Sequence, residues 1–190
     1  MDRRQALSRV ALILGGTIIG SGVFLEGCKP ADQPAKTGMN FDQEDVAFLD
    51  EVADTILPTT STPGAKAAKV GAFMTVMVKD CYEEKDQKTF RAGMGKLNEA
   101  SKKKFDKLFV ETTPEQRHDL LVEIDKEQKE YTAKKGKDDE NHYFRMMKEL
   151  TLLGYFTSEI GATQALRYVE TPGRYDGCVP YKKGDKAWAT

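Results

Sequence analysis

Apolar residues recur at helical spacing through most of this chain. In the first such segment the series runs Phe41, Val46, Leu49, Val52 and Ile56, which places one apolar stripe along a helix. No segment of strand length alternates apolar with polar residues. Since an amphipathic helix must bury its stripe against other helices, the pattern predicts an all-α fold. We expect a compact bundle of about five or six helices with an irregular C-terminal tail.

Start and stop signals divide this pattern into separate helices. We predict helices over residues 41–56, 70–82, 84–109, 114–134 and 143–156. Asn40 is the expected N-cap of the first, and Thr113 with Pro114 marks the start of the fourth. Gly93 and Gly95 are expected to weaken the first half of the third. The last helix is the most apolar, so we predict that it forms the centre of the core.

The C-terminal tail has a different character. Residues 169–181 contain two prolines and two glycines and show no helical period. So long a stretch without secondary structure must be held by contacts, and we expect these from Cys178, Tyr175 and Tyr181. Trp188 lies in the last three residues, where it either contacts a partner or lies disordered.

The N-terminal segment, residues 1–28, is predicted to be an export signal. A basic stretch, residues 2–9, precedes the uncharged stretch Val10 to Phe24, which would span about 22 Å as a helix and is marginal for a permanent span. It therefore has the character of a signal peptide. Arg3 and Arg4 resemble a twin-arginine signal, which serves proteins that fold before export, and the general secretory route is the alternative.

The end of this segment resembles a lipobox. Leu25-Glu26-Gly27-Cys28 would place a lipid on Cys28 and make it the new N-terminus, although Glu26 departs from the usual small or apolar residue. Residues 29–40 are rich in proline and polar residues and suit a flexible tether. The folded domain would then be residues 41–190. Cleavage elsewhere or an uncleaved anchor are the alternatives.

The charge balance argues against a nucleic-acid partner. The chain has 29 basic and 30 acidic residues, a formal net charge of −1. The basic run at residues 102–104 is followed by Asp106 and is typical of a solvated helix face. No basic excess remains that would indicate binding to nucleic acid.

Three cysteines are present, and none lies in a CxxC motif. If Cys28 belongs to the export signal, Cys81 and Cys178 remain as a pair in an oxidising compartment. We therefore predict a Cys81–Cys178 disulfide. Two separate buried thiols are the alternative.

No motif predicts catalysis, cofactor binding or a metal site in this chain. His118 and His142 lie outside any metal-binding spacing, and no glycine-rich loop follows a strand. Thr157 or Ser158 is expected to cap a helix beginning near residue 160, because the sequence around Ser158 lacks the pattern of a nucleophile elbow. A weaker reading makes the chain an enzyme that uses Glu159 and His142.

Three carboxylates on the first predicted helix allow two interpretations. Asp50, Glu51 and Asp54 lie close together along that helix. They could form an acid/base pair, but a solvated helix face is the expected role.

Two stretches resemble the gluconate 2-dehydrogenase subunit 3 family. Residues 52–68, VADTILPTTSTPGAKAA, are similar to its start. Residues 150–161, LTLLGYFTSEIG, followed by Tyr168, Pro172-Gly173 and residues 175–181, are similar to its end. The resemblance covers about residues 41–181, and the leader with its arginine pair also fits the family.

The resemblance implies an accessory role. Family members are small, non-catalytic subunits of membrane-associated dehydrogenases that oxidise sugars or sugar acids. The large subunit binds FAD and removes the hydride, and a cytochrome c subunit carrying haem c often takes the electrons. The small subunit supplies the export signal and accompanies the folded large subunit to the bacterial periplasm or cell envelope.

For this chain, the resemblance places the partner contacts at Tyr155, Phe156, Tyr175 and Tyr181 and the membrane attachment at the signal or a lipid anchor. A stand-alone envelope lipoprotein with a ligand-binding or structural role is the alternative function.

Overall fold

A computed structural model describes residues 40–175 and 177–189. The predictions for Arg3, Arg4 and Cys28 lie outside the described residues. Five α-helices form most of the domain: α2 (Gln43–Ile56), α3 (Val70–Cys81), α4 (Glu84–Phe105), α5 (Pro114–Lys134) and α6 (Tyr143–Phe156). The short elements are a 3-10 turn η1 (Phe109–Glu111), a π-helical turn η2 (Gly161–Ala165), and strands β1 (Arg167–Tyr168) and β2 (Trp188–Ala189). The prediction of an all-α fold is confirmed, with the starts of α3, α4, α5 and α6 at the predicted residues.

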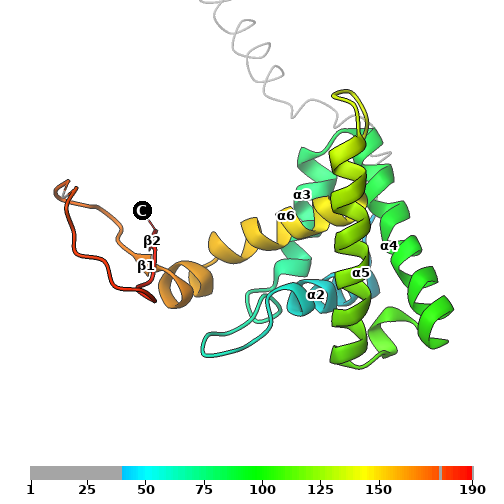
Figure 1. Cartoon of the computed structure of the whole chain (residues 1–190), viewed down its shortest axis with the longest axis horizontal. Coiled ribbons are helices and arrows are strands. Elements are labelled where there is room, and N and C mark those ends of the chain that lie inside the picture. The colour runs from blue at the N-terminus through cyan, green and yellow to red at the C-terminus, as the bar shows by residue number, and fades with distance from the viewer. Residues whose placement is uncertain (1–39, 176, 190) are drawn as a thin grey trace, which may run out of the picture. The chain divides into compact units, whose positions relative to one another are not determined.

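Helix α6 is the central element, as predicted. It contacts α2, α3, α4 and α5, and Figure 1 shows it crossing between them before it runs outward. Phe144, Met147 and Leu150, within its first eight residues, are buried. The second half extends beyond the other helices and carries η2 and the strands at its end. None of the helices within residues 40–175 and 177–189 combines the length and apolar character needed to span a membrane.

Of the two predicted N-cap residues, the one for α5 is correct and the one for α2 is wrong. Thr113 caps α5 as predicted: its Oγ1 accepts a hydrogen bond from Gln116 N–H at 3.3 Å, and Gln116 Oε1 accepts one from Thr113 N–H at 3.1 Å. The N-cap of α2 is Asp42, not Asn40. Asp42 forms a reciprocal capping box with Asp45, in which Asp45 N–H donates a hydrogen bond to Asp42 Oδ1 at 2.8 Å. This box satisfies backbone N–H groups of the first turn, so the helix begins after Asp42 and not after Asn40.

Helix α4 ends earlier than predicted, at Phe105. Asp106 takes the left-handed conformation with φ 57° and closes the helix. The chain then turns so that Phe109 enters the core, where its ring lies 5.5 Å from that of Phe48. The expected helix continuation over residues 106–109 is wrong because burying Phe109 requires this turn.

Gly93 allows α4 and α6 to approach closely. A Cβ atom at Gly93 would lie 2.3 Å from the Cβ of Tyr143, whereas one at Gly95 would have no neighbour within 4 Å. Helix α4 is unbroken through both positions. Gly93 therefore serves the packing of the core rather than only weakening the helix.

The chain turns sharply after α6. Ser158 Oγ accepts a hydrogen bond from Gly161 N–H at 3.0 Å and donates one to Tyr155 O at 2.6 Å, which agrees with the predicted capping role. A Cβ at Gly161 would lie 1.8 Å from Tyr155 O, so only glycine fits here without a backbone shift. This turn directs the chain into the tail.

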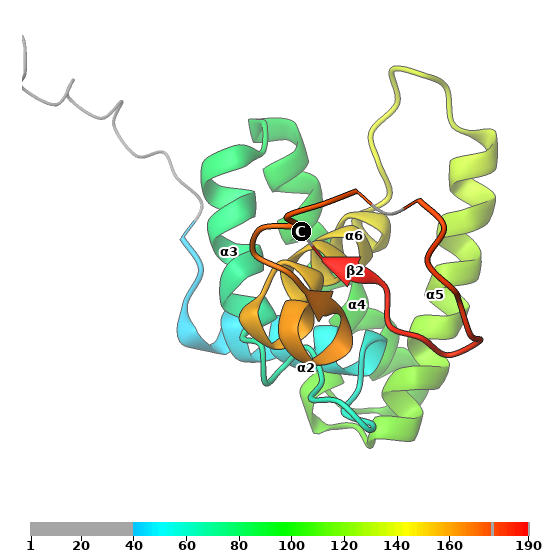
Figure 2. The ribbon, with the colours of Figure 1, turned by 90° about the vertical axis from the view of Figure 1, so that its left-hand side faces the viewer.

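We name the tail, residues 167–175 and 177–189, the C-terminal hook. Strands β1 and β2 pair in parallel at its base, with Arg167 N–H donating to Ala187 O at 2.8 Å and Val169 N–H donating to Ala189 O at 2.9 Å. Figure 2 shows the hook leaving and returning to the end of α6. The strand pair that contains Trp188 anchors the base of the tail. Tyr175, Cys178 and Tyr181, which were predicted to pin the tail, are exposed, so that prediction is wrong for the two tyrosine rings.

Candidate functional site

The two histidines lie apart and have different environments. His118 is exposed on α5, whereas His142 is the N-cap of α6, where its Nδ1 accepts a hydrogen bond from Phe144 N–H at 3.2 Å. Glu159 lies just beyond the other end of α6, roughly 20 Å away along the helix axis. Glu159 and His142 therefore cannot act on one substrate. The described residues contain no group of three potential metal-binding side chains.

The surroundings of His142 favour its neutral form. Its ring lies 4.4 Å from that of Tyr143, and its Nε2 lies 3.9 Å from Glu127 Oε1. Burial lowers the pKa of His142, and Lys96 lowers it further, against the opposing effect of Glu127. Burial, with help from Glu127, raises the pKa of Tyr143 to about 12. The neutral form matters for the start of α6, because His142 Nδ1 can accept the hydrogen bond from Phe144 N–H only when it carries no proton.

The carboxylates of α2 have structural partners. Asp50 Oδ1 accepts a hydrogen bond from Gly71 N–H at 2.8 Å and so ties down the start of α3. Glu51 pairs with both Lys66 and Arg117. Burial lowers the pKa of Arg117, and its Nε lies buried with no hydrogen-bond partner among the described residues. The expectation of a solvated face is wrong for Asp50 and Glu51, because both join α2 to neighbouring segments.

The predicted Cys81–Cys178 disulfide is not formed in the part of the chain that the structure describes. Cys81 is an exposed free thiol at the end of α3. Its neighbour Tyr82 lies beside α6, where burial and the Glu149 carboxylate raise the pKa of Tyr82. Cys178 belongs to the hook, which begins only after α6 and η2 have ended. The spacing of two cysteines along the sequence does not show whether their elements lie side by side, so the disulfide prediction is wrong for this structure.

The predicted partner contacts fall into two groups. Tyr155 is only 4% exposed, and its hydroxyl donates a hydrogen bond to Pro63 O at 2.7 Å. Tyr155 therefore stabilises the fold, and the prediction that it contacts a partner is corrected. The other three side chains reach solvent: Phe156 is 37% exposed, Tyr181 75% and Tyr175 97%.

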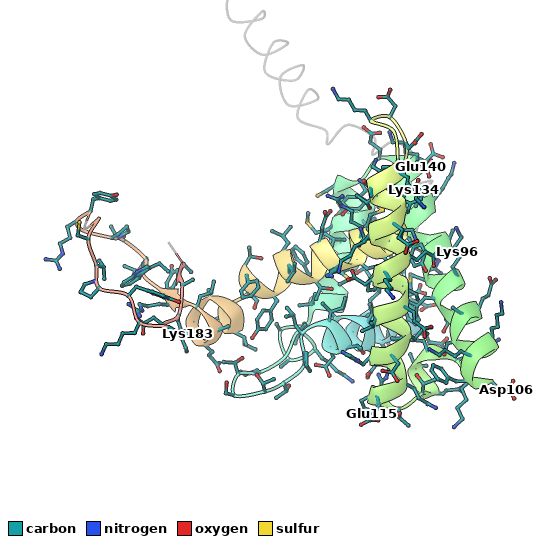
Figure 3. All side chains as sticks on the ribbon, viewed as in Figure 1. Lys96, Asp106, Glu115, Lys134, Glu140 and Lys183 are labelled. Atoms are coloured by element: carbon teal, nitrogen blue, oxygen red, sulfur yellow. The ribbon has the colours of Figure 1, made fainter. Side chains whose placement is uncertain are left out.

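Further large apolar side chains are exposed on the same two segments, α6 and the hook. On α6, Leu152 and Leu153 are exposed beside Phe156, and we name these three residues the α6 ridge. The hook exposes five large apolar side chains: Tyr168, Tyr175, Val179, Tyr181 and Trp188. Figure 3 shows hook side chains projecting outward, with Lys183 far from Asp106 and Glu115 on the helices.

Phe156 of the α6 ridge was predicted as a partner contact, but Leu152 and Leu153 were predicted to lie in the core, because α6 is apolar around most of its circumference. A helix of that kind must be covered on several sides. The second half of α6 contacts α3 through Gly154 and Phe73 but leaves the ridge open. The ridge and the hook together are the candidate site, a surface suited to contact with another macromolecule.

Comparison with known proteins gives one match. A family model described as gluconate 2-dehydrogenase subunit 3 matches residues 43–173, which include α2 to α6, η2 and the start of the hook. No curated protein and no solved structure matches the chain.

Proposed function

This chain belongs to the gluconate 2-dehydrogenase subunit 3 family, and from that premise we propose that it is a non-catalytic accessory subunit that binds an FAD-dependent gluconate or sugar dehydrogenase large subunit. The observation that carries the proposal is the family match over residues 43–173. The family's name makes its members subunits of a dehydrogenase complex. The exposed apolar surface of the α6 ridge and the hook supports a binding role.

The flavin belongs to the large subunit in this proposal. A dinucleotide site of the common type needs a strand, a glycine-rich turn and a helix whose N-terminus faces the phosphates. The described residues do not fit that requirement, since β1 and β2 have two residues each and pair only with one another. In the same proposal, a cytochrome c subunit that carries haem c accepts the electrons.

The proposal also assigns an escort role to residues 1–28. A flavoprotein that folds around its cofactor in the cytoplasm needs a route that exports folded proteins. Arg3 and Arg4 would supply that signal for both subunits, and lipidation at Cys28 would hold the complex at the periplasmic face of the cell envelope.

Changing both arginines to lysine tests the escort role. The charge of the leader is kept in Arg3→Lys/Arg4→Lys, but the arginine pair is lost. We expect the co-expressed flavoprotein to remain in the cytoplasm, as measured by flavin and antibody signal in fractionated cells. Arg9→Lys is the matched control and should leave export unchanged.

Unimpaired export of the flavoprotein from the double variant would refute the escort role. A chain purified from membranes as a stable monomer with no flavoprotein would favour the alternative, a stand-alone envelope lipoprotein.

A further inference from the structure

We propose that the α6 ridge and the C-terminal hook form one docking surface that grips the FAD-dependent large subunit. This inference rests on the proposed function and specifies which face of the accessory subunit is used. Three independent properties of the surface carry it: the incomplete structure of the hook, its exposed apolar area and its charge.

The described part of the hook has no buried core of its own. Every described residue from Glu170 to Trp188 is exposed, and a connection of this length without secondary structure is uncommon unless it is functional or disordered. Parallel strand pairs are almost always covered on both faces. Here β1 and β2 form an isolated parallel pair, and Tyr168 and Trp188 on it remain about half exposed. Another molecule covering the pair would complete this arrangement.

The base of the hook is nevertheless well anchored. The Arg167 guanidinium lies over the Trp188 ring at 4.4 Å from its centre. Lys186 Nζ donates a hydrogen bond to Gln164 O. Lys182 and Asp185 close a turn in which Lys182 N–H donates to Asp185 Oδ2 at 2.9 Å. An anchored base reduces the entropy that binding must remove, while Tyr175 and Tyr181 farther along the hook remain exposed to a partner.

The exposed area suits a stable heteromeric interface. The α6 ridge and the hook expose five aromatic residues. At about 200 Å² for a fully exposed aromatic residue, their exposed fractions correspond to roughly 600 Å². Leu152, Leu153 and Val179 add to this total. A standard interface buries about 800 Å² on each partner, so the ridge and the hook supply most of such a surface.

Charge indicates what the partner presents. Residues 167–189 include 5 basic and 3 acidic side chains, whereas residues 40–166 include 19 basic and 24 acidic ones. The partner surface should therefore be acidic around apolar pockets that accept tyrosine rings. A second copy of this chain is also acidic over its helices, but a hook-to-helix contact between copies would be heterologous and would tend to extend into chains or rings. We therefore assign the surface to the large subunit.

Site-specific photo-crosslinking in the co-expressed complex tests the assignment. The photoreactive residue p-benzoylphenylalanine replaces Tyr175, Tyr181 or Leu153 in the full chain. Matched positions are Val122 on α5 and Val110 in η1, which are exposed and apolar but lie outside the surface. We expect crosslinks to the large subunit from the first three positions and none from the two controls.

Affinity gives the second readout. We expect Tyr175→Ser/Tyr181→Ser to weaken the complex at least about tenfold, as for aromatic hot spots, with an unchanged circular dichroism spectrum because both rings are exposed. Val122→Ser should not weaken it. Higher salt should weaken the wild-type complex, because the hook is basic.

Each outcome supports or overturns the inference. A retained complex that crosslinks from Val122 or Val110 but not from the hook overturns it, and so does a double variant that binds like wild type. A crosslinked dimer of this chain overturns it in favour of self-association. If the wild-type chain forms no complex with the large subunit, the proposed function fails, and the docking assignment fails with it.

Discussion

Two glycines on α4, Gly93 and Gly95, are two residues apart and therefore point to nearly opposite sides of the helix, so they should respond oppositely to alanine. Gly93 faces Tyr143 of α6, and a Cβ there would lie 2.3 Å from the Cβ of Tyr143. Gly95 faces open space. The substitutions Gly93→Ala and Gly95→Ala therefore add the same methyl group to the same helix and differ only in what that group meets.

The magnitudes follow from this difference. Alanine in a helix interior is favoured over glycine by about 1 kcal/mol, so Gly95→Ala should raise the free energy of unfolding by about that amount. At Gly93 the same gain is opposed by overpacking, which costs about 1–3 kcal/mol or more. The clash is with a Cβ atom, which cannot rotate away, so we place the cost at the upper end. The net effect of Gly93→Ala should be a loss of about 2 kcal/mol.

Urea denaturation of the full chain, followed by circular dichroism, measures both changes. For a domain of this size, 1 kcal/mol corresponds to about 2–4 °C in Tm, so a thermal scan should show shifts of opposite sign. Equal stabilisation by both substitutions would refute the close approach of α4 and α6 at Gly93.

Three further changes probe the caps and the buried polar contacts. Burial lowers the folded-state pKa of His142 below that of the unfolded chain, so its contribution to stability should be present above about pH 6.5 and decline as the pH falls below that value. The variant His142→Asn keeps a capping side chain but does not titrate, so it should flatten this pH dependence of stability in urea titrations. An unchanged pH dependence would contradict the role assigned to His142. Tyr155→Phe loses the hydrogen bond to Pro63 O and should cost about 1 kcal/mol of stability without weakening the complex with the large subunit. Weaker binding at unchanged stability would restore Tyr155 as a partner contact. Thr113→Ala removes the hydroxyl that accepts the Gln116 N–H hydrogen bond at the start of α5 and should cost about 1 kcal/mol in denaturant unfolding. An unchanged stability would show that this hydrogen bond is not formed.

Sequence reasoning worked best where the signal is local. The start of α5 was predictable because Thr113 and Pro114 form a local N-terminal signal, and Gln116 completes the capping box in the structure. Helix α6 was predictable because its apolar residues are dense enough to require burial. Both features depend on neighbours along the chain, and such signals are readable without knowing the tertiary structure.

The features that were missed depend on contacts between distant segments. The end of α4 follows from the turn at Asp106 that buries Phe109 against Phe48. The hook is held by the pairing of Arg167 with Trp188, two residues 21 positions apart. No local pattern indicates such contacts, because strands of two residues are too short to show alternation.

The candidate site was predictable only in part. Phe156, Tyr175 and Tyr181 are exposed, consistent with the predicted partner contacts, while Tyr155 is buried. Tyr155 and Phe156 are adjacent on α6 and face different environments because successive helical residues point about 100° apart. The resemblance to a family pointed to the segment of α6 that contains Tyr155 and Phe156. Only the packing of α6 shows which side of that helix is buried and which side forms the exposed ridge.

The most direct test of the central claim is the flavin content of the purified chain. The full chain is co-expressed with the FAD-dependent large subunit, purified through a tag on this chain, and examined by its visible absorption spectrum and by the stoichiometry of the eluted subunits. We predict a flavin spectrum with one large subunit for each copy of this chain, lost or greatly reduced in Tyr175→Ser/Tyr181→Ser and retained in Val122→Ser. A wild-type preparation without flavin or large subunit would contradict the account.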